Sequence, residues 1–161
     1  MNSQESKVQT ILHVEDSDID HEALRRSFHK MRIDINISWC RSSLEAHEYL
    51  AEEAQSTFGK LKMALPSLIL LDLNLPGEDG RSFLKKLRSI PRIAIIPVII
   101  LTSSSDPKDV HACFALGANA YLLKPLNPRD LDPVVQAFAQ FWLKHAVLPA
   151  APASLVKGTL I

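Results

Sequence analysis

The stretch that decides the fold is Ser67-Leu68-Ile69-Leu70-Leu71-Asp72-Leu73-Asn74-Leu75-Pro76-Gly77. It is an apolar run that ends on one carboxylate and then enters a turn. Such a run is typical of an interior parallel strand, because both faces of that strand are buried. In open α/β sheets, ligands bind just beyond the carboxyl ends of the strands. Asp72 therefore lies where a functional site is expected.

The rest of the chain alternates between strand and helix patterns. Residues 33–39 alternate apolar with polar side chains, which is typical of a half-exposed strand at a sheet edge. Because right-handed crossovers place helices on both faces of a parallel sheet, the pattern predicts an α/β, flavodoxin-like (βα)5 three-layer sandwich with strand order 2-1-3-4-5. Strands are expected at 10–14, 33–39, 67–72, 97–102 and 120–123, and helices at 19–31, 42–54, 81–89, 106–117 and 127–144.

The composition favours one globular domain, since the chain has 161 residues and 47% of them are hydrophobic. We expect a disordered N-terminus at 1–8, one folded domain at 9–145 and a tail at 146–161. The loosest internal stretch, residues 55–66, is expected to be a loop. No DNA-binding output domain is expected after Lys144.

Charge and apolar runs exclude several partners. The 18 basic residues balance the 18 acidic residues, so no overall field attracts nucleic acid or an anionic membrane. The longest apolar run, 93–101, is interrupted by Pro97 and is shorter than the roughly 20 residues of a membrane helix. Cys40 and Cys113 form no Cys-x-x-Cys pair, which favours a reducing compartment. The sequence therefore predicts a cytoplasmic protein.

Carboxylate, hydroxyl or ammonium side chains lie at the ends of four of the five predicted strands. In a parallel sheet these ends meet at one edge, where neighbouring carboxylates repel one another and attract a hard cation such as Mg²⁺. A cation, a hydroxyl and an ammonium around one carboxylate indicate phosphoryl transfer. Each residue alone is more often a turn or surface residue, so the inference rests on their joint placement. The residues are Glu15-Asp16, Asp72 as nucleophile, Thr102, and Lys124 as phosphate clamp.

With these motifs, residues 10–143 resemble a bacterial response-regulator receiver domain, the phospho-acceptor half of two-component signalling. The resemblance implies that Asp72 accepts a phosphoryl group from a sensor histidine kinase. It also implies a Mg²⁺ site in which Asp16 is a direct ligand, Glu15 acts through water, and Asp72 is joined by the backbone carbonyl of Asn74. Two departures from the common pattern are Glu15 in place of Asp and a longer turn after Asp72.

The resemblance also implies a set of switch residues. Thr102 matches the switch hydroxyl, Lys124 matches the family's lysine, and Pro125 matches the proline after it, which usually follows a cis peptide bond. Tyr121, three residues before Lys124, matches the aromatic switch residue. The family is not a classical enzyme: the chain is expected to be a stoichiometric acceptor with Mg²⁺-dependent self-phosphorylation and self-dephosphorylation.

Two other function classes compete with this interpretation. An aspartyl-nucleophile phosphatase on a related α/β fold also uses a carboxylate at a strand end. Such hydrolases usually carry an acid two residues later, and the amide of Asn74 cannot transfer that proton. A nucleotide- or flavin-binding protein is disfavoured because the chain has no glycine-rich phosphate loop. Asp18 and Asp20 are interpreted as helix-start carboxylates rather than ligands.

The C-terminal segment carries a narrower resemblance, to the single-domain response regulators that serve bacterial and cyanobacterial phytochrome kinases. It rests on Phe141-Trp142-Leu143 and Val147-Leu148-Pro149. Three large apolar residues in succession point in different directions, so at least one must leave the helix's buried face. We expect a homodimer, with the alternative that the tail folds back over Trp142 within one chain. The expected interface residues are Phe141, Trp142, Leu143 and Leu148.

Overall fold

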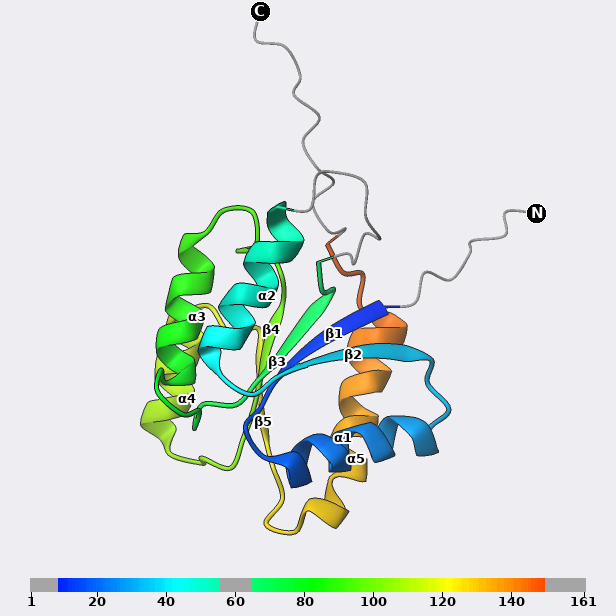
Figure 1. The fold of residues 1–161 in the computed structure, drawn as a ribbon. Helices are drawn as coiled ribbons and strands as arrows, with labels where there is room; N and C mark the ends of the chain where they lie inside the picture. The colour runs from blue at the N-terminus through cyan, green and yellow to red at the C-terminus, as the bar shows by residue number, and fades with distance from the viewer. Residues whose placement is uncertain (1–8, 56–64, 150–161) are drawn as a thin grey trace, which may run out of the picture.

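A five-stranded parallel sheet forms the centre of the computed structural model, which describes residues 9–55 and 65–149. The strand order β2-β1-β3-β4-β5 confirms the predicted topology (Figure 1). Strand β2 lies at the edge and its side chains are mostly half-buried or exposed, as its alternating sequence predicts. The strands are β1 (Gln9–Val14), β2 (Ile35–Cys40), β3 (Leu68–Leu71), β4 (Val98–Thr102) and β5 (Ala120–Leu123).

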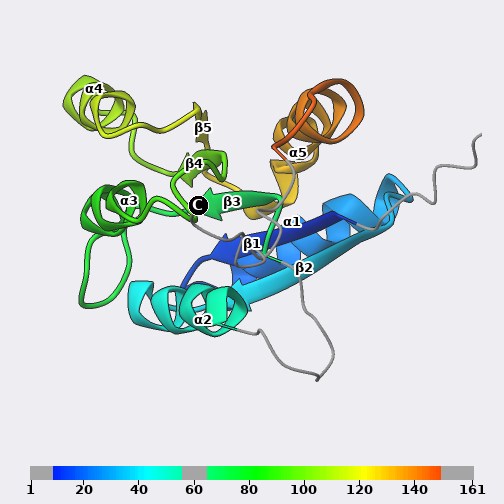
Figure 2. The ribbon, with the colours of Figure 1, turned by 90° about the horizontal axis from the view of Figure 1, so that it is seen from above.

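Helices cover both faces of this sheet. Helices α1 and α5 pack on one face, and α2, α3 and α4 pack on the other (Figure 2). None of the helices within the described ranges is long and apolar enough to cross a membrane. The helices are α1 (Asp18–Lys30), α2 (Ser43–Gln55), α3 (Gly80–Ser89), α4 (Pro107–Ala115) and α5 (Asp132–Phe138), with a 3-10 turn (Pro128–Asp130) before α5 and a π-helical segment (Ala139–His145) after it.

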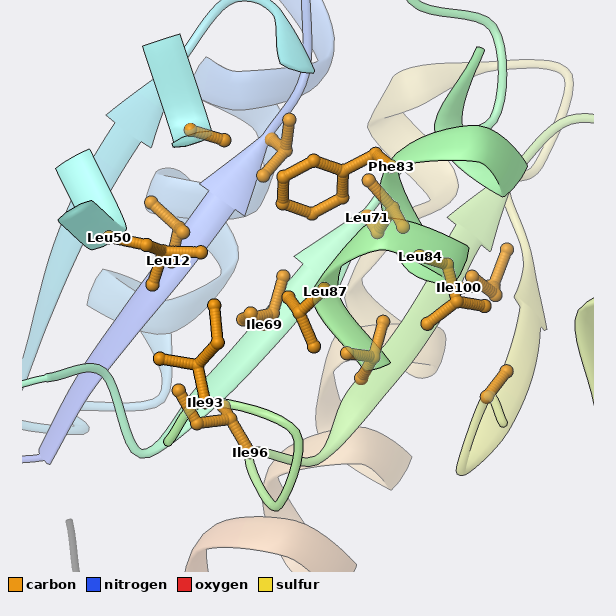
Figure 3. Close-up of a cluster of buried hydrophobic side chains, with 14 of the residues drawn as sticks. Leu12, Leu50, Ile69, Leu71, Phe83, Leu84, Leu87, Ile93, Ile96 and Ile100 are labelled. Carbon is orange, nitrogen blue, oxygen red and sulfur yellow. The ribbon is translucent and has the colours of Figure 1, made fainter. Parts of the chain in front are cut away.

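The core lies in two layers because successive strand residues point to opposite faces. In β3, Ile69 and Leu71 face α2 and α3, whereas Leu68 and Leu70 face α1 and α5. All four are buried, which agrees with the strand's position inside the sheet. Figure 3 shows the first layer, in which the side chains of α3 meet those of the central strands. The contributing α3 side chains are Phe83, Leu84 and Leu87.

Capping side chains fix where the helices begin next to the strand ends. The side chain of Ser17 accepts a hydrogen bond from the backbone N–H of Asp20, which starts α1 directly after the acidic pair. Asp79 caps α3 in the same way, and Asp106 caps α4 ahead of Pro107. The helix starts expected at residues 19, 81 and 106 agree with these observed starts to within one residue.

The last helix differs from the prediction of one continuous helix over 127–144. Pro133 lacks the N–H that a helix beginning at Asn127 would need, so a 3-10 turn comes first and α5 begins at Asp132. After Phe138 the chain widens into the π-helical segment, where the N–H of Ala146 donates to the carbonyl of Phe141 over 2.7 Å. The predictions for residues 1–8, for most of the loop at 55–66 and for 150–161 lie outside the described residues.

Candidate functional site

The carboxyl ends of β1, β3, β4 and β5 meet at one edge of the sheet, as the parallel topology requires. The ammonium of Lys124, just after β5, donates hydrogen bonds to three carboxylates there. Its Nζ lies 2.5 Å from Glu15 Oε2, 2.7 Å from Asp72 Oδ2 and 2.9 Å from Asp20 Oδ2. The structure thus brings together residues more than a hundred positions apart in the chain.

A compact acidic cluster surrounds this ammonium. One oxygen each from Glu15, Asp16 and Asp72 lie within 4.8 Å of one another. Glu15 and Asp72 are buried, being 1% and 6% exposed, while Asp16 faces solvent. Carboxylate oxygens open to water on one side suit a hard divalent cation, which keeps several of its own waters. The donor set therefore fits Mg²⁺.

The protonation of Glu15 and Lys124 depends on their burial and their mutual charges. Burial raises the pKa of Glu15 to about 7, although the Lys124 ammonium opposes this shift. Burial alone would lower the pKa of Lys124, but the carboxylates of Glu15 and Asp72 outweigh burial and hold that pKa above its ordinary value. Lys124 is therefore charged at neutral pH.

A pH dependence of stability follows from Glu15. Because its folded pKa lies above the unfolded value, its contribution to stability is fully present below about pH 4.5 and is lost as the pH rises towards 7. In EDTA, we expect the wild type to lose unfolding free energy relative to Glu15→Gln as the pH rises from about 4.5 to 7. Urea denaturation at several pH values measures it. A pH-independent difference would contradict the raised pKa.

The loop between β3 and α3 holds Asp72 in place. The backbone N–H of Asn74 donates to Asp72 Oδ1 over 3.3 Å, and the N–H of Gly80 donates to the carbonyl of Leu73 over 3.0 Å. A Cβ atom at Gly80 would lie 2.3 Å from the Asp72 carbonyl oxygen, so only glycine fits there. Gly77 adopts a left-handed φ of 76° with open space around it.

Thr102 ends β4 beside this site. Its hydroxyl is fully buried and has no hydrogen-bond partner among the described residues. A buried hydroxyl without a partner is costly, so a group that supplied an acceptor would gain a favourable bond. Two residues on, the carbonyl of Ser104 accepts a hydrogen bond from the hydroxyl of Tyr121 over 2.9 Å. The β4–α4 loop thus connects Thr102 to Tyr121.

The same loop is tied to the start of α3. The hydroxyl of Ser104 donates to Asp109 over 2.6 Å, and Asp109 also pairs with the guanidinium of Arg81. Arg81 bonds in turn to Asp79, the residue that caps α3. Asp79 and Arg81 therefore connect the Tyr121 side of the loop to the segment that carries Asp72.

One site residue goes beyond its sequence interpretation, and one expectation needs correction. Asp20 lies in the first turn of α1, as its interpretation as a helix-start carboxylate predicts, but its side chain also bonds Lys124 and so belongs to the site. Its signal was the Ser17-x-x-Asp20 spacing, which puts the carboxylate in the first turn of α1, next to the acidic pair. The expected cis peptide before Pro125 is wrong for this structure, because the described residues contain no cis peptide bond.

Some of the C-terminal apolar side chains are exposed, and others pack against the core. Phe141 is 57% exposed, as the prediction that one large side chain leaves the buried face requires. Trp142, Leu143 and Leu148 instead pack, partly buried, against the core layer under α1 and α5 of their own chain. Trp142 and Leu148 thus pack within their own chain, and the homodimer stays a prediction. Val147 is fully exposed.

Comparisons with known proteins agree with this arrangement. The sequence profile of the response regulator receiver domain matches residues 11–136. The chain is similar to the response regulator Rcp1 of Synechocystis sp., with 36% identity over 151 residues, which are 94% of this chain and 100% of Rcp1.

Two solved structures are similar to the fold. One is the phosphorylated cyanobacterial phytochrome response regulator RcpA, with a TM-score of 0.79 and 32% identity, covering 89% of this chain and 100% of RcpA. The other is the Mn²⁺-bound form of Rcp1, with a TM-score of 0.76 and 38% identity, covering 88% of this chain and 99% of the Rcp1 chain.

Proposed function

Because the chain belongs to the response regulator receiver domain family and is a phosphoryl-accepting response regulator, we propose that Asp72 is the residue that accepts the phosphoryl group. The observation that carries this assignment is the bonding of Lys124 to Asp72, Glu15 and Asp20 at one sheet edge. Asp72 ends the buried strand β3, and its carboxylate is held from two sides, by Lys124 and by the N–H of Asn74.

Phosphoryl transfer follows from these positions. A carboxylate oxygen of Asp72 forms a bond to the phosphorus of a phosphohistidine on the kinase, the P–N bond breaks, and the leaving imidazole takes up a proton. The Lys124 ammonium neutralises charge on the phosphoryl oxygens. Attack by water on the same phosphorus later returns phosphate and the free carboxylate.

The proposed Mg²⁺ site uses the acidic cluster. Asp16, Asp72 and the backbone carbonyl of Asn74 would hold the ion directly, and Glu15 would act through water. When bound, Mg²⁺ supplies positive charge to the phosphoryl oxygens. Among relatives, Rcp1 has a Mn²⁺-bound form, which supports a divalent-cation site here.

The direct experiment is incubation with acetyl phosphate and Mg²⁺, followed by intact-mass measurement. We expect one phosphoryl group per chain, and none when EDTA replaces Mg²⁺, because self-phosphorylation needs the cation. Uptake that is independent of Mg²⁺ would contradict the metal site. A phosphatase is not favoured, because the residue two positions after Asp72 is Asn74, whose amide cannot act as an acid.

Thr102, Tyr121 and Pro125 form the proposed switch. The unpartnered hydroxyl of Thr102 can bond the new phosphoryl oxygens, and its loop carries the carbonyl that holds Tyr121. A hydrogen bond to a charged group contributes about 1.5 to 3 kcal/mol, which shifts a two-state equilibrium roughly 10- to 150-fold. Pro125 would follow the movement of Lys124, its neighbour in the chain.

We expect Thr102→Ala to accept phosphate but to respond poorly. The NMR signals of Tyr121 should change with beryllofluoride, a phosphoryl analogue, in the wild type and in Thr102→Ser, which keeps the hydroxyl. In Thr102→Ala that change should be largely lost. An equal change in Thr102→Ala would show that the response of Tyr121 does not require the Thr102 hydroxyl.

The phosphoryl donor is a histidine kinase, and we assign it to the phytochrome class. The similarity to Rcp1 and to the phytochrome response regulator RcpA over nearly the whole chain supports this assignment. A cytoplasmic location accompanies the proposal, because Cys40 and Cys113 are free thiols. Faster phosphotransfer from a phytochrome kinase than from an unrelated histidine kinase is the expected result.

A homodimer through the C-terminal segment completes the proposal. The exposed side chains Phe141 and Val147 would form its centre, with the half-buried Trp142, Leu143 and Leu148 at its margin. A symmetric pair is the commonest way to cover such a patch.

Phe141→Glu is expected to shift the dimer towards monomer by at least about ten-fold in dissociation constant, since it places a charge in the contact. Leu44→Glu on α2 is the matched control, because Leu44 is also exposed but lies on the opposite face of the sheet. Light scattering at micromolar concentrations measures both. A wild type that stays monomeric with and without beryllofluoride would contradict the dimer but not the phosphotransfer.

A further inference from the structure

The backbone of Glu15 is held at both of its polar groups by the neighbouring edge strand β2. Its N–H donates to the carbonyl of Cys40 over 2.9 Å. Its carbonyl accepts a hydrogen bond from the indole Nε1–H of Trp39 over 2.7 Å. Sheet pairing between β1 and β2 ends at Val14 and Cys40. The indole bond therefore ties β2 to Glu15, one residue beyond the last residue pair of the two strands.

The indole ring is itself fixed by two partners. The ring of His21 in α1 stacks on it, with centroids 3.9 Å apart and planes 7° from parallel. The guanidinium carbon of Arg41 lies 4.3 Å from the ring centroid, and Arg41 pairs with Asp18 at the start of α1 over 2.5 Å. The donor of Trp39 is thus held in one position relative to both β2 and α1.

The acidic pair Glu15-Asp16 lies between β1 and α1. Glu15 and Asp16 connect the end of β1 to Ser17, the residue that caps α1, and the N–H of Ser17 donates to Glu15 Oε1 over 3.1 Å. The indole N–H of Trp39 bonds the backbone carbonyl of Glu15 and not its carboxylate. It acts through the Glu15 backbone, whereas Lys124 and Ser17 act on the Glu15 side chain.

We propose that Trp39 is a positioning residue for the divalent-cation site, and that its indole donor fixes the Glu15-Asp16 backbone in the geometry the cation needs. This inference rests on the proposed Mg²⁺ site. Mg²⁺ accepts only near-ideal octahedral geometry, so small displacements of its ligands lower its affinity. Removing the hydrogen-bond partners behind metal ligands commonly weakens metal binding.

Trp39→Phe tests the donor alone, because phenylalanine keeps an aromatic ring for His21 and loses the N–H. Loss of one neutral hydrogen bond predicts a Mg²⁺ affinity about five-fold weaker. Isothermal titration of Mg²⁺ into the full chain measures it. Ile37→Ala is the control, since Ile37 lies in the same strand and packs on the core layer under α1 and α5. It should lower stability and leave Mg²⁺ affinity unchanged.

NMR reports whether the Trp39 donor responds to the cation. The chain has two tryptophans, so its spectrum has two indole N–H signals, and Trp39→Phe assigns them. On saturation with Mg²⁺, the Trp39 signal should shift and the Trp142 signal should stay in place.

The outcomes separate this inference from the proposed function. Weaker Mg²⁺ binding by Trp39→Phe, with normal binding by Ile37→Ala, supports the positioning role. Wild-type affinity in Trp39→Phe, or equal loss in both variants, overturns that role and leaves the metal site standing. No Mg²⁺ binding by the wild type overturns the metal site and the positioning role together.

Discussion

Asp72→Asn is expected to take up no phosphoryl group from acetyl phosphate and Mg²⁺, a loss of at least about a thousand-fold in labelling rate. The reason is chemical, because the amide nitrogen is not a nucleophile and the amide has lost the carboxylate charge. The fold should survive, since Lys124 keeps its bonds to Glu15 and Asp20 and the amide oxygen can still accept a hydrogen bond. Intact-mass measurement over time reports the labelling.

Asp106→Asn is the matched control for this variant. Asp106 caps α4 on the surface, and asparagine caps a helix about as well as aspartate. The control should therefore be labelled like the wild type. Labelling of Asp72→Asn at the control's rate would refute the assignment of the acceptor.

Gly80→Ala is expected to destabilise the fold by about 3 kcal/mol, because a well-packed backbone cannot easily make room for an added atom. The new Cβ would lie 2.3 Å from the Asp72 carbonyl oxygen and 2.9 Å from the Cα of Leu73. Both contacts are with backbone, so relief requires the β3–α3 loop to move. Because that loop carries Asp72, phosphorylation should slow as well.

Gly77→Ala, in the same loop, is the comparison. It meets nothing within 4 Å, but its φ of 76° is unfavourable for alanine and costs about 1 kcal/mol. Urea denaturation should therefore rank Gly80→Ala as clearly less stable than Gly77→Ala. Equal stabilities would contradict the close approach of Gly80 to the backbone of Asp72 and Leu73.

The fold was predictable because its signals are local. The buried run before Asp72 and the alternation in β2 each act within a few positions. The strand ends then place Asp72, Thr102 and Lys124 together through topology alone. That step needed only the rule that parallel strands end at the same edge.

Other features depend on distances that no local pattern encodes. The reach of Asp20 to Lys124 depends on how far α1 is turned relative to β5. The bond from Trp39 to Glu15 joins β2 to the residue just after β1, and these two strands pair only in the folded sheet. The delayed start of α5 was different, because Pro133 was visible in the sequence and its missing N–H required the break.

Mapping the phosphorylated residue in the wild-type chain tests the central claim most directly. After reaction with acetyl phosphate and Mg²⁺, borohydride reduces an acyl phosphate and leaves a stable mark on the residue that carried it. Peptide mass spectrometry then locates the mark. The account predicts a single mark at Asp72. A mark at Asp16, at Glu15 or at any other residue, with Asp72 unmodified, would contradict it.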